Sequence, residues 1–240
     1  MHRNDLQRVY ELRDLLPDPV PEGAYFANFD ETLTEWPGKK VRFLEIEAEL
    51  QGLDAEAWAF LKTELTPLLK AKDAARGWQQ LFDKLNQAKG YNHLKRLGCT
   101  GIRFIPEAKI KGNPTPDIEA TENGRTVLCE VKTINASEIE ATRRRTGSVG
   151  HSTDHLNEQF LGKLRLTVEQ AAKQMQAYNA DVRARRIAYV VINFDDMLHE
   201  YADRYAPQLE EFRANYPASG PEIVLCYKGP FGTEDQNHGG

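Results

Sequence analysis

The feature that most constrains the fold is a predicted β-hairpin in the middle of the chain. Two strand-like runs, PDIEATE at 116–122 and RTVLCEVKTI at 125–134, are separated only by Asn123-Gly124. Asn-Gly is the dipeptide that best fits a two-residue hairpin turn, because both turn positions need a positive φ. The sequence therefore predicts an antiparallel pair of strands at a fixed register.

This register decides which side chains meet across the hairpin. Glu122 pairs with Arg125, and continuing the pairing places Asp117 directly opposite Glu130. Because side chains alternate along a strand, the hairpin has two different faces. The apolar face carries Ile118, Ala120, Val127, Cys129 and Val131. The mostly ionisable face carries Asp117, Glu119, Leu128, Glu130 and Lys132.

Helical patterns precede the hairpin. Asp54 is the expected N-cap of a helix whose apolar residues keep helical spacing as far as Pro67. A second helix is expected from about Asp73 to Gly98, and the apolar run GIRFIP after it predicts a strand.

Alternating helices and strands are also predicted after the hairpin. Thr167 and Gln170 have the spacing of a capping box at the start of a helix, and IAYVVINF is typical of a central strand buried on both faces. A helix over 199–214 and a last strand, EIVLCYK, complete the order. This order predicts an α/β fold with a mixed central sheet and flanking helices.

Charge and proline content divide the chain. Residues 1–60 carry thirteen acidic against six basic side chains, and three prolines at 17, 19 and 21 predict an irregular segment as far as about Gly38. We therefore expect an acidic extension of helices and loops over 1–72, an α/β domain over 73–232 and a flexible polar tail over 233–240.

Composition excludes several classes of protein. No run approaches the roughly 18 to 20 apolar residues of a membrane-spanning helix, and the polar N-terminus does not resemble a signal peptide. We expect a soluble cytoplasmic protein that has no membrane partner. Its three widely spaced cysteines predict buried thiols rather than a disulfide framework or a zinc site, and its net charge of -5 argues against a general nucleic-acid coat.

The ionisable face of the hairpin is where chemistry is expected. Two carboxylates directly opposite each other destabilise a sheet unless a positive charge lies near them. Asp117 and Glu130 therefore predict a divalent cation, and oxygen ligands favour Mg²⁺. Lys132 lies on the same face and directs a second positive charge to the edge of this site.

The motif Pro116-Asp117, followed by Glu130-Val131-Lys132, resembles that of the PD-(D/E)xK nuclease superfamily. The resemblance covers about 73–195, and it implies a restriction-endonuclease-like αβββαβ core and Mg²⁺ or Mn²⁺ as cofactor. It implies that Asp117, Glu130 and the Val131 carbonyl hold the metal while Lys132 assists the attacking water. Further candidates for this site are Asp83, Glu107, Glu119, Gln170 and Gln174.

The resemblance implies hydrolysis of nucleic-acid phosphodiester bonds, with DNA favoured over RNA. Residues 140–186 carry nine basic against five acidic side chains, which favours phosphate contacts in this part of the chain. The candidate nucleic-acid contacts are Arg143, Arg144, Arg145 and Lys173.

Three alternatives stay open at this point. The first is a nuclease-fold protein that no longer cleaves and instead binds nucleic acid or a protein. The second is a plain interaction module for which the acidic extension is the partner surface, and a protein partner or a homodimer stays possible. The third is purely structural: Glu130 and Lys132 line a solvated sheet face, and Asp117 only caps the turn after Pro116.

Overall fold

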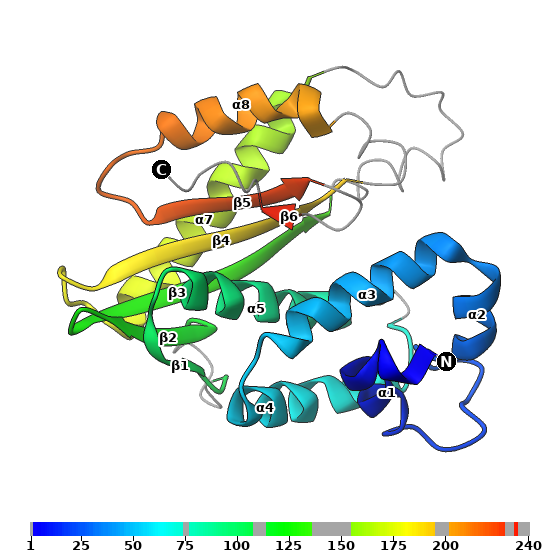
Figure 1. The fold of residues 1–240 in the computed structure, drawn as a ribbon. Coiled ribbons are helices and arrows are strands. Elements are labelled where there is room, and N and C mark those ends of the chain that lie inside the picture. Colours follow the sequence, from blue (N-terminus) through cyan, green and yellow to red (C-terminus); the bar gives the residue numbers. More distant parts are fainter. Residues whose placement is uncertain are drawn as a thin grey trace. The chain divides into compact units, whose positions relative to one another are not determined.

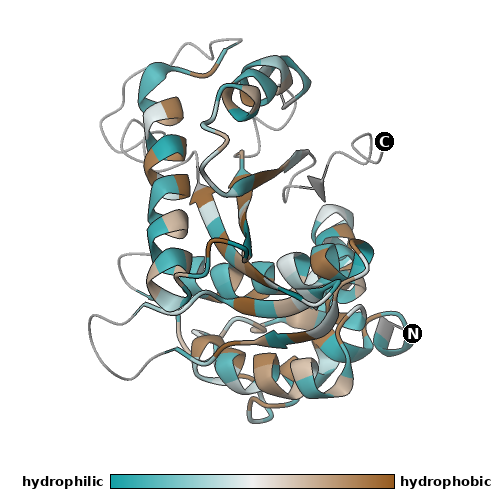
Figure 2. Cartoon of the chain, turned by 90° about the vertical axis from the view of Figure 1, so that its left-hand side faces the viewer, coloured by the Kyte–Doolittle hydropathy of each residue, from teal (hydrophilic) through white to brown (hydrophobic). Residues whose placement is uncertain are grey.

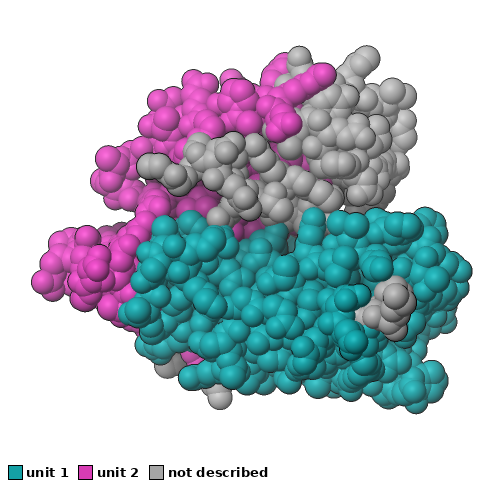
Figure 3. Space-filling model, in the orientation of Figure 1, with its two compact units in different colours: residues 1–104 teal, residues 105–240 magenta. Residues whose placement is uncertain are grey.

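The computed structural model describes residues 2–73, 77–107, 114–135, 155–194, 202–228 and 233–234. The chain forms two compact units, Met1–Phe104 and Ile105–Gly240 (Figure 3). The boundary expected from sequence lies after residue 72. The helix and the strand between residues 73 and 104 therefore belong to the first unit and not, as expected, to the α/β domain.

The first unit is mainly helical. Its elements are the 3-10 helices η1 (His2–Asn4) and η2 (Thr66–Leu69), the helices α1 (Gln7–Arg13), α2 (Phe29–Glu35), α3 (Pro37–Gln51), α4 (Ala55–Leu65) and α5 (Gln79–Arg96), and the strand β1 (Thr100–Phe104) (Figure 1). The expected cap of α4 is confirmed, since the Asp54 carboxylate accepts a hydrogen bond from the Ala57 N–H at 2.8 Å.

Two expectations for the first unit are wrong. The segment before Gly38 is not irregular throughout, because Phe29 and Leu33 are buried and form part of helix α2. The Phe29 ring packs edge-on against Phe43 of α3 with 4.8 Å between centroids, and this aromatic contact supports a short helix of only seven residues. Helix α5 begins at Gln79 rather than near Asp73.

The second unit contains a five-stranded mixed sheet in the order β2-β3-β4-β5-β6 (Figure 1). Its elements are β2 (Ile118–Glu122), β3 (Arg125–Asn135), α7 (Glu158–Tyr178), β4 (Arg185–Asn193), α8 (Ala202–Ala214), β5 (Glu222–Lys228) and β6 (Thr233–Glu234). The pairs β2–β3 and β5–β6 are antiparallel, whereas β3, β4 and β5 run parallel. Helix α7 lies in the crossover that the parallel pair β3–β4 requires.

The core of the second unit forms between the sheet and the two helices α7 and α8. Strand β4 is buried on both faces as predicted, since every residue from Ile187 to Ile192 is at most 1% exposed. Apolar residues are concentrated on the central strands, whereas polar and apolar residues alternate along the helices (Figure 2). This distribution makes the unit an α/β structure in which helices flank the sheet.

Two boundaries in this unit differ from expectation. Helix α7 begins at Glu158, nine residues before the expected capping box, because the Asn157 carboxamide oxygen accepts the Phe160 N–H at 2.8 Å. Thr233 and Glu234 do not belong to a tail but pair with β5.

Other expectations from composition can be compared directly. All three cysteines are buried, as predicted. Among the described residues, no helix combines the length and the apolar character that spanning a membrane requires.

Candidate functional site

The hairpin turn positions the candidate site. Asn123 and Gly124 both adopt positive φ, 49° and 78°, as a two-residue turn of this type requires. The register predicted from the turn is confirmed, with Glu122 opposite Arg125 and Ile118 opposite Cys129. Continuing this register by one residue brings Asp117, just before β2, opposite Glu130 in β3.

Asp117 joins the start of β2 to the middle of β3. Its backbone N–H donates to Oε2 of Glu130 at 3.1 Å, and its own Oδ2 accepts the backbone N–H of Val131 at 2.8 Å. The Asp117 carbonyl in turn accepts the Ile105 N–H at 2.8 Å. Three hydrogen bonds therefore fix the main chain and the carboxylate of Asp117 beside Glu130.

Pro116 cannot supply the hydrogen bond that the carbonyl of Val131 would otherwise accept across the hairpin. In the continued register these two residues are opposite each other, and proline has no N–H to donate. The Asp117 carboxylate accepts the N–H of Val131, but Pro116 cannot donate to the carbonyl of Val131 across the ladder. That carbonyl is therefore a third oxygen that the strand pairing itself leaves available beside the two carboxylates.

Glu130 is the most deeply buried acidic group of the site. Only 2% of the residue is exposed, so the alternative of a solvated sheet face is wrong for Glu130. Burial, and after it the negative charge of Asp117, raise the pKa of its carboxyl group to about 8 against the opposing effect of Lys132. Ionised Glu130 beside Asp117 would therefore give the site more negative charge than Lys132 offsets.

Lys132 lies beside this carboxylate and is held from helix α7. Its Nζ is 2.5 Å from Oε1 of Glu130 and 3.3 Å from Oε1 of Gln174. The Nε2 of Gln174 donates to the Thr115 carbonyl at 2.5 Å. Gln174 thus links Lys132 to the segment that leads into Asp117, and α7 covers the face that the sequence predicts to be ionisable.

The structure brings only some of the sequence-predicted residues together. Asp117, Glu130, Val131, Lys132 and Gln174 form one cluster. Glu119 lies on the same sheet face but contacts the hydroxyl of Tyr178 at 3.5 Å. Gln170 and Lys173 are exposed on α7, and Glu107 is exposed just after the β1 segment.

Asp83 belongs to α5 of the first unit and is half-buried there. Arg143, Arg144 and Arg145 lie outside the described residues. Sequence reasoning missed Thr115, whose backbone carbonyl accepts the hydrogen bond from Gln174. Every residue has a backbone carbonyl, so the residue type could not have indicated this contact.

The donor set of the cluster fits a hard divalent cation. Within the described parts of the chain, no group of three or more His, Cys, Asp or Glu side chains is arranged to hold a metal ion. The cluster offers two carboxylates and the Val131 carbonyl, and Mg²⁺ commonly binds through one or two carboxylates while keeping several waters. The raised pKa of Glu130 means that its ionised form is poorly stabilised beside Asp117, and a divalent cation would stabilise that form.

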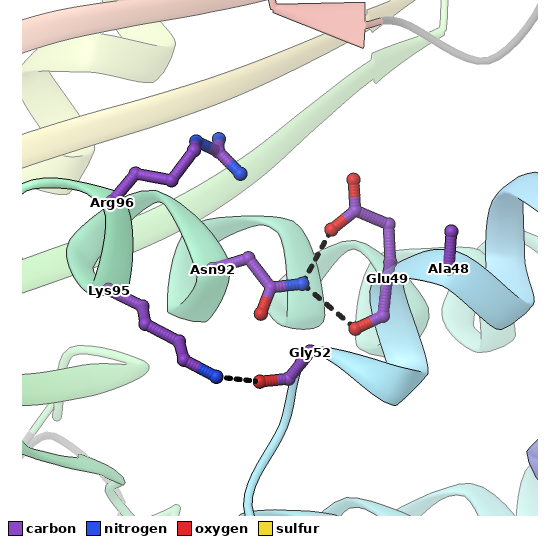
Figure 4. A pocket seen from close by; sticks show the side chains of 6 residues that line it. All are labelled: Ala48, Glu49, Gly52, Asn92, Lys95 and Arg96. Carbon is purple, nitrogen blue, oxygen red and sulfur yellow. Dashed lines mark hydrogen bonds between the residues drawn. The ribbon is translucent and has the colours of Figure 1, made fainter.

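A pocket away from this cluster lies in the first unit, between α3 and α5. It is an open pocket of about 420 Å³ lined by Ala48, Glu49, Gly52, Asn92, Lys95 and Arg96 (Figure 4). The Asn92 Nδ2 donates to the carbonyl of Glu49 at 2.8 Å and to its carboxylate at 2.7 Å, and Lys95 Nζ donates to the Gly52 carbonyl at 2.9 Å. These contacts tie the end of α3 to α5, which is a structural role.

Comparison with protein-family models, curated proteins and solved structures gave no match for this chain.

Proposed function

We propose that the chain is a metal-dependent nuclease of the PD-(D/E)xK type that hydrolyses nucleic-acid phosphodiester bonds. The observation that carries this proposal is the meeting of Asp117 and Glu130 across the hairpin, with the Lys132 ammonium beside them. The order of elements along the chain, α5, β1, β2, β3, α7 and β4, supports a restriction-endonuclease-like core. The preference for DNA over RNA rests on the sequence resemblance alone.

Each residue has a distinct part in this proposal. Asp117, Glu130 and the Val131 carbonyl would hold Mg²⁺ or Mn²⁺, which when bound supplies Lewis-acid activation of the phosphodiester and of water. The Lys132 ammonium has three N–H donors, so it can orient the attacking water and offset negative charge that develops on the phosphate. Gln174 keeps Lys132 at the edge of the carboxylate pair.

Cleavage of labelled single- and double-stranded DNA and RNA, with and without Mg²⁺ or Mn²⁺, tests the proposal. We expect metal-dependent cleavage by the wild type and its loss in Asp117→Asn, together with loss of metal binding by calorimetry. Lys132→Ala should retain metal binding but cleave about 10²- to 10⁴-fold more slowly, which is the usual effect of removing a group that assists proton transfer.

Glu122→Gln is the matched control, because this carboxylate lies in the same hairpin but pairs with Arg185 at 2.7 Å. It should cleave like the wild type. Equal activity of wild type and Asp117→Asn would contradict the proposal.

A second candidate function is metal or nucleic-acid binding without cleavage. It is favoured by the small number of carboxylates in the cluster. Asp117 and Glu130 are the only two that the described contacts join, which is enough to bind a metal ion. Metal binding that depends on Asp117, with no cleavage of any of the four substrates, would support this second function.

A further inference from the structure

The outer face of α7 carries a narrow row of exposed side chains. Lys163, Leu166, Gln170 and Lys173, which we call the α7 strip, are all exposed and recur every three or four residues, so they lie on one face of the helix. The opposite face packs into the core through Phe160, Leu164, Val168, Ala171 and Met175. The strip is therefore the solvent face of a helix that the core holds firmly.

The strip begins beside the candidate site. Gln170 lies one turn before Gln174, whose side chain contacts Lys132, and is only about 40° from it around the helix axis. Lys163 lies about 20° around the axis from Gln174 and about 16 Å along the helix towards its N-terminus. A polymer bound at the site and lying along α7 would therefore follow the strip.

The charge of the strip is positive although the chain as a whole is acidic. Two of its four members are lysines and none is a carboxylate, against a net charge of -5 for the chain. Of the acidic residues of α7, Glu158 lies about 160° around the axis from Gln174, whereas Glu169 precedes Lys173 by four residues and borders the strip about 40° from it. Two lysines against this one carboxylate still leave the edge of α7 positive, which suits a polyanion.

Leu166 distinguishes between kinds of polyanion. It lies between the two lysines and is 59% exposed, which is high for a large apolar side chain. A duplex presents mainly phosphates and sugars to a passing helix, so Leu166 would gain little from contacting it. A single strand also exposes the faces of its bases, which pack well against apolar side chains.

We propose that the α7 strip is the track of a single-stranded nucleic acid, on which Lys163 and Lys173 contact phosphates and Leu166 contacts a base. This inference rests on the proposed nuclease function and goes beyond it by naming the form of the substrate and its path to the site.

The test measures binding rather than cleavage. In an Asp117→Ala background, fluorescence anisotropy would follow a labelled oligothymidylate and the matching dA·dT duplex between about 50 and 200 mM salt. The double variant Lys163→Gln, Lys173→Gln should lower the magnitude of the slope of log K against log salt for the single strand by about 1.4, because each of the two lost phosphate contacts accounts for about 0.7. Leu166→Gln should weaken single-strand binding without changing that slope.

Arg183→Gln is the control, since this arginine has an 83% exposed side chain and lies outside the strip, just before β4. It should leave binding unchanged. An unchanged slope in the double variant overturns the track, and so does an equal loss of strand and duplex binding on changing Leu166. Cleavage by the wild type, measured separately, shows whether the nuclease proposal survives that result. If the wild type neither binds nor cleaves nucleic acid, both proposals are overturned.

Discussion

The ammonium of Lys132 lies 2.5 Å from the buried carboxylate of Glu130, in a site that also contains Asp117. In the protein without metal, this lysine is the cation that partly offsets two adjacent carboxylates. A divalent metal ion would compete with it for the same negative charge. The two positive charges are therefore coupled, and removing one should strengthen the binding of the other.

We predict that Lys132→Met binds Mn²⁺ more tightly than the wild type, by about tenfold, because about 1.4 kcal/mol is a moderate value for the loss of one nearby repulsive charge. The same change also strengthens the binding of a proton to Glu130, but the gain in binding free energy is about twice as large for a doubly charged metal ion. Calorimetry at pH 9 would measure the effect with little proton competition. Unchanged or weaker Mn²⁺ binding would contradict this competition.

Glu130 should also make stability depend on pH. Its pKa is raised to about 8 by burial and by Asp117, whereas in the unfolded chain it returns to an ordinary value near 4.3. Between these values the unfolded state loses its proton first, so the free energy of unfolding of the metal-free protein should fall as pH rises from about 4.5 to 8. Above pH 8 this contribution should become constant.

Glu130→Gln is the matched variant, because it keeps the shape of the side chain and cannot ionise. Denaturant unfolding should show a flatter pH profile for this variant and a greater stability than the wild type at pH 8 to 9, by a few kcal/mol. Below about pH 4 the two proteins should differ little in this respect. Parallel profiles for the two proteins would mean that Glu130 does not hold its proton as described.

The part of the site that the sequence predicts well is the part set by local geometry. An Asn-Gly turn fixes a two-residue loop, and the loop fixes the register that brings Asp117 to Glu130. The burial of Glu130 could not be predicted in this way. Strand alternation identifies its face as ionisable, but only the packing of α7 decides that this face is covered.

The helices show the same limit. The start of α7 was missed because Gly162 weakens the helical pattern between Phe160 and Leu164, although both residues are buried and continue its apolar face. The cap at Asp54 was found because the signal for an N-cap lies within a few residues of it. Both caps are short-range signals, but only the one at Asp54 is followed by an uninterrupted helical pattern, whereas Gly162 interrupts the pattern after Asn157.

In the first unit, Glu47 and Arg8 support each other's helices. The buried carboxylate of Glu47 accepts the N–H groups of Arg8 at 3.0 Å and Val9 at 2.8 Å, at the start of α1. The guanidinium of Arg8 donates to the carbonyls of Leu50 and Leu53, at the end of α3. Each side chain thus caps the helix that carries the other.

We predict that Glu47→Ala destabilises the protein by about 2 to 4 kcal/mol, because it leaves two backbone donors without their acceptor in a buried place. Glu47→Gln should cost less, since its amide oxygen still accepts a hydrogen bond. Thermal unfolding followed by circular dichroism would rank the three proteins. Exposed Glu56→Ala is a control on α4 and should change stability by less than about 0.5 kcal/mol.

Gly52 is the residue that allows α3 to end against α5. A Cβ atom placed on Gly52 would meet the amide of Asn92, with the Cγ and Nδ2 atoms at only 2.6 Å, and Asn92 is 92% buried and hydrogen-bonded to Glu49. We predict that Gly52→Ala destabilises the protein by about 1 to 3 kcal/mol, the usual cost of overpacking.

The double variant Gly52→Ala, Asn92→Ala separates this clash from a loss of backbone freedom. Gly52 has an ordinary φ of -67°, so alanine fits its backbone and the second change should remove the clash. In denaturant unfolding, the double variant should therefore lose less stability than the sum of the two single variants, because each single change acts on the same contact. Simple additivity would show that Asn92 is not what excludes a side chain at position 52.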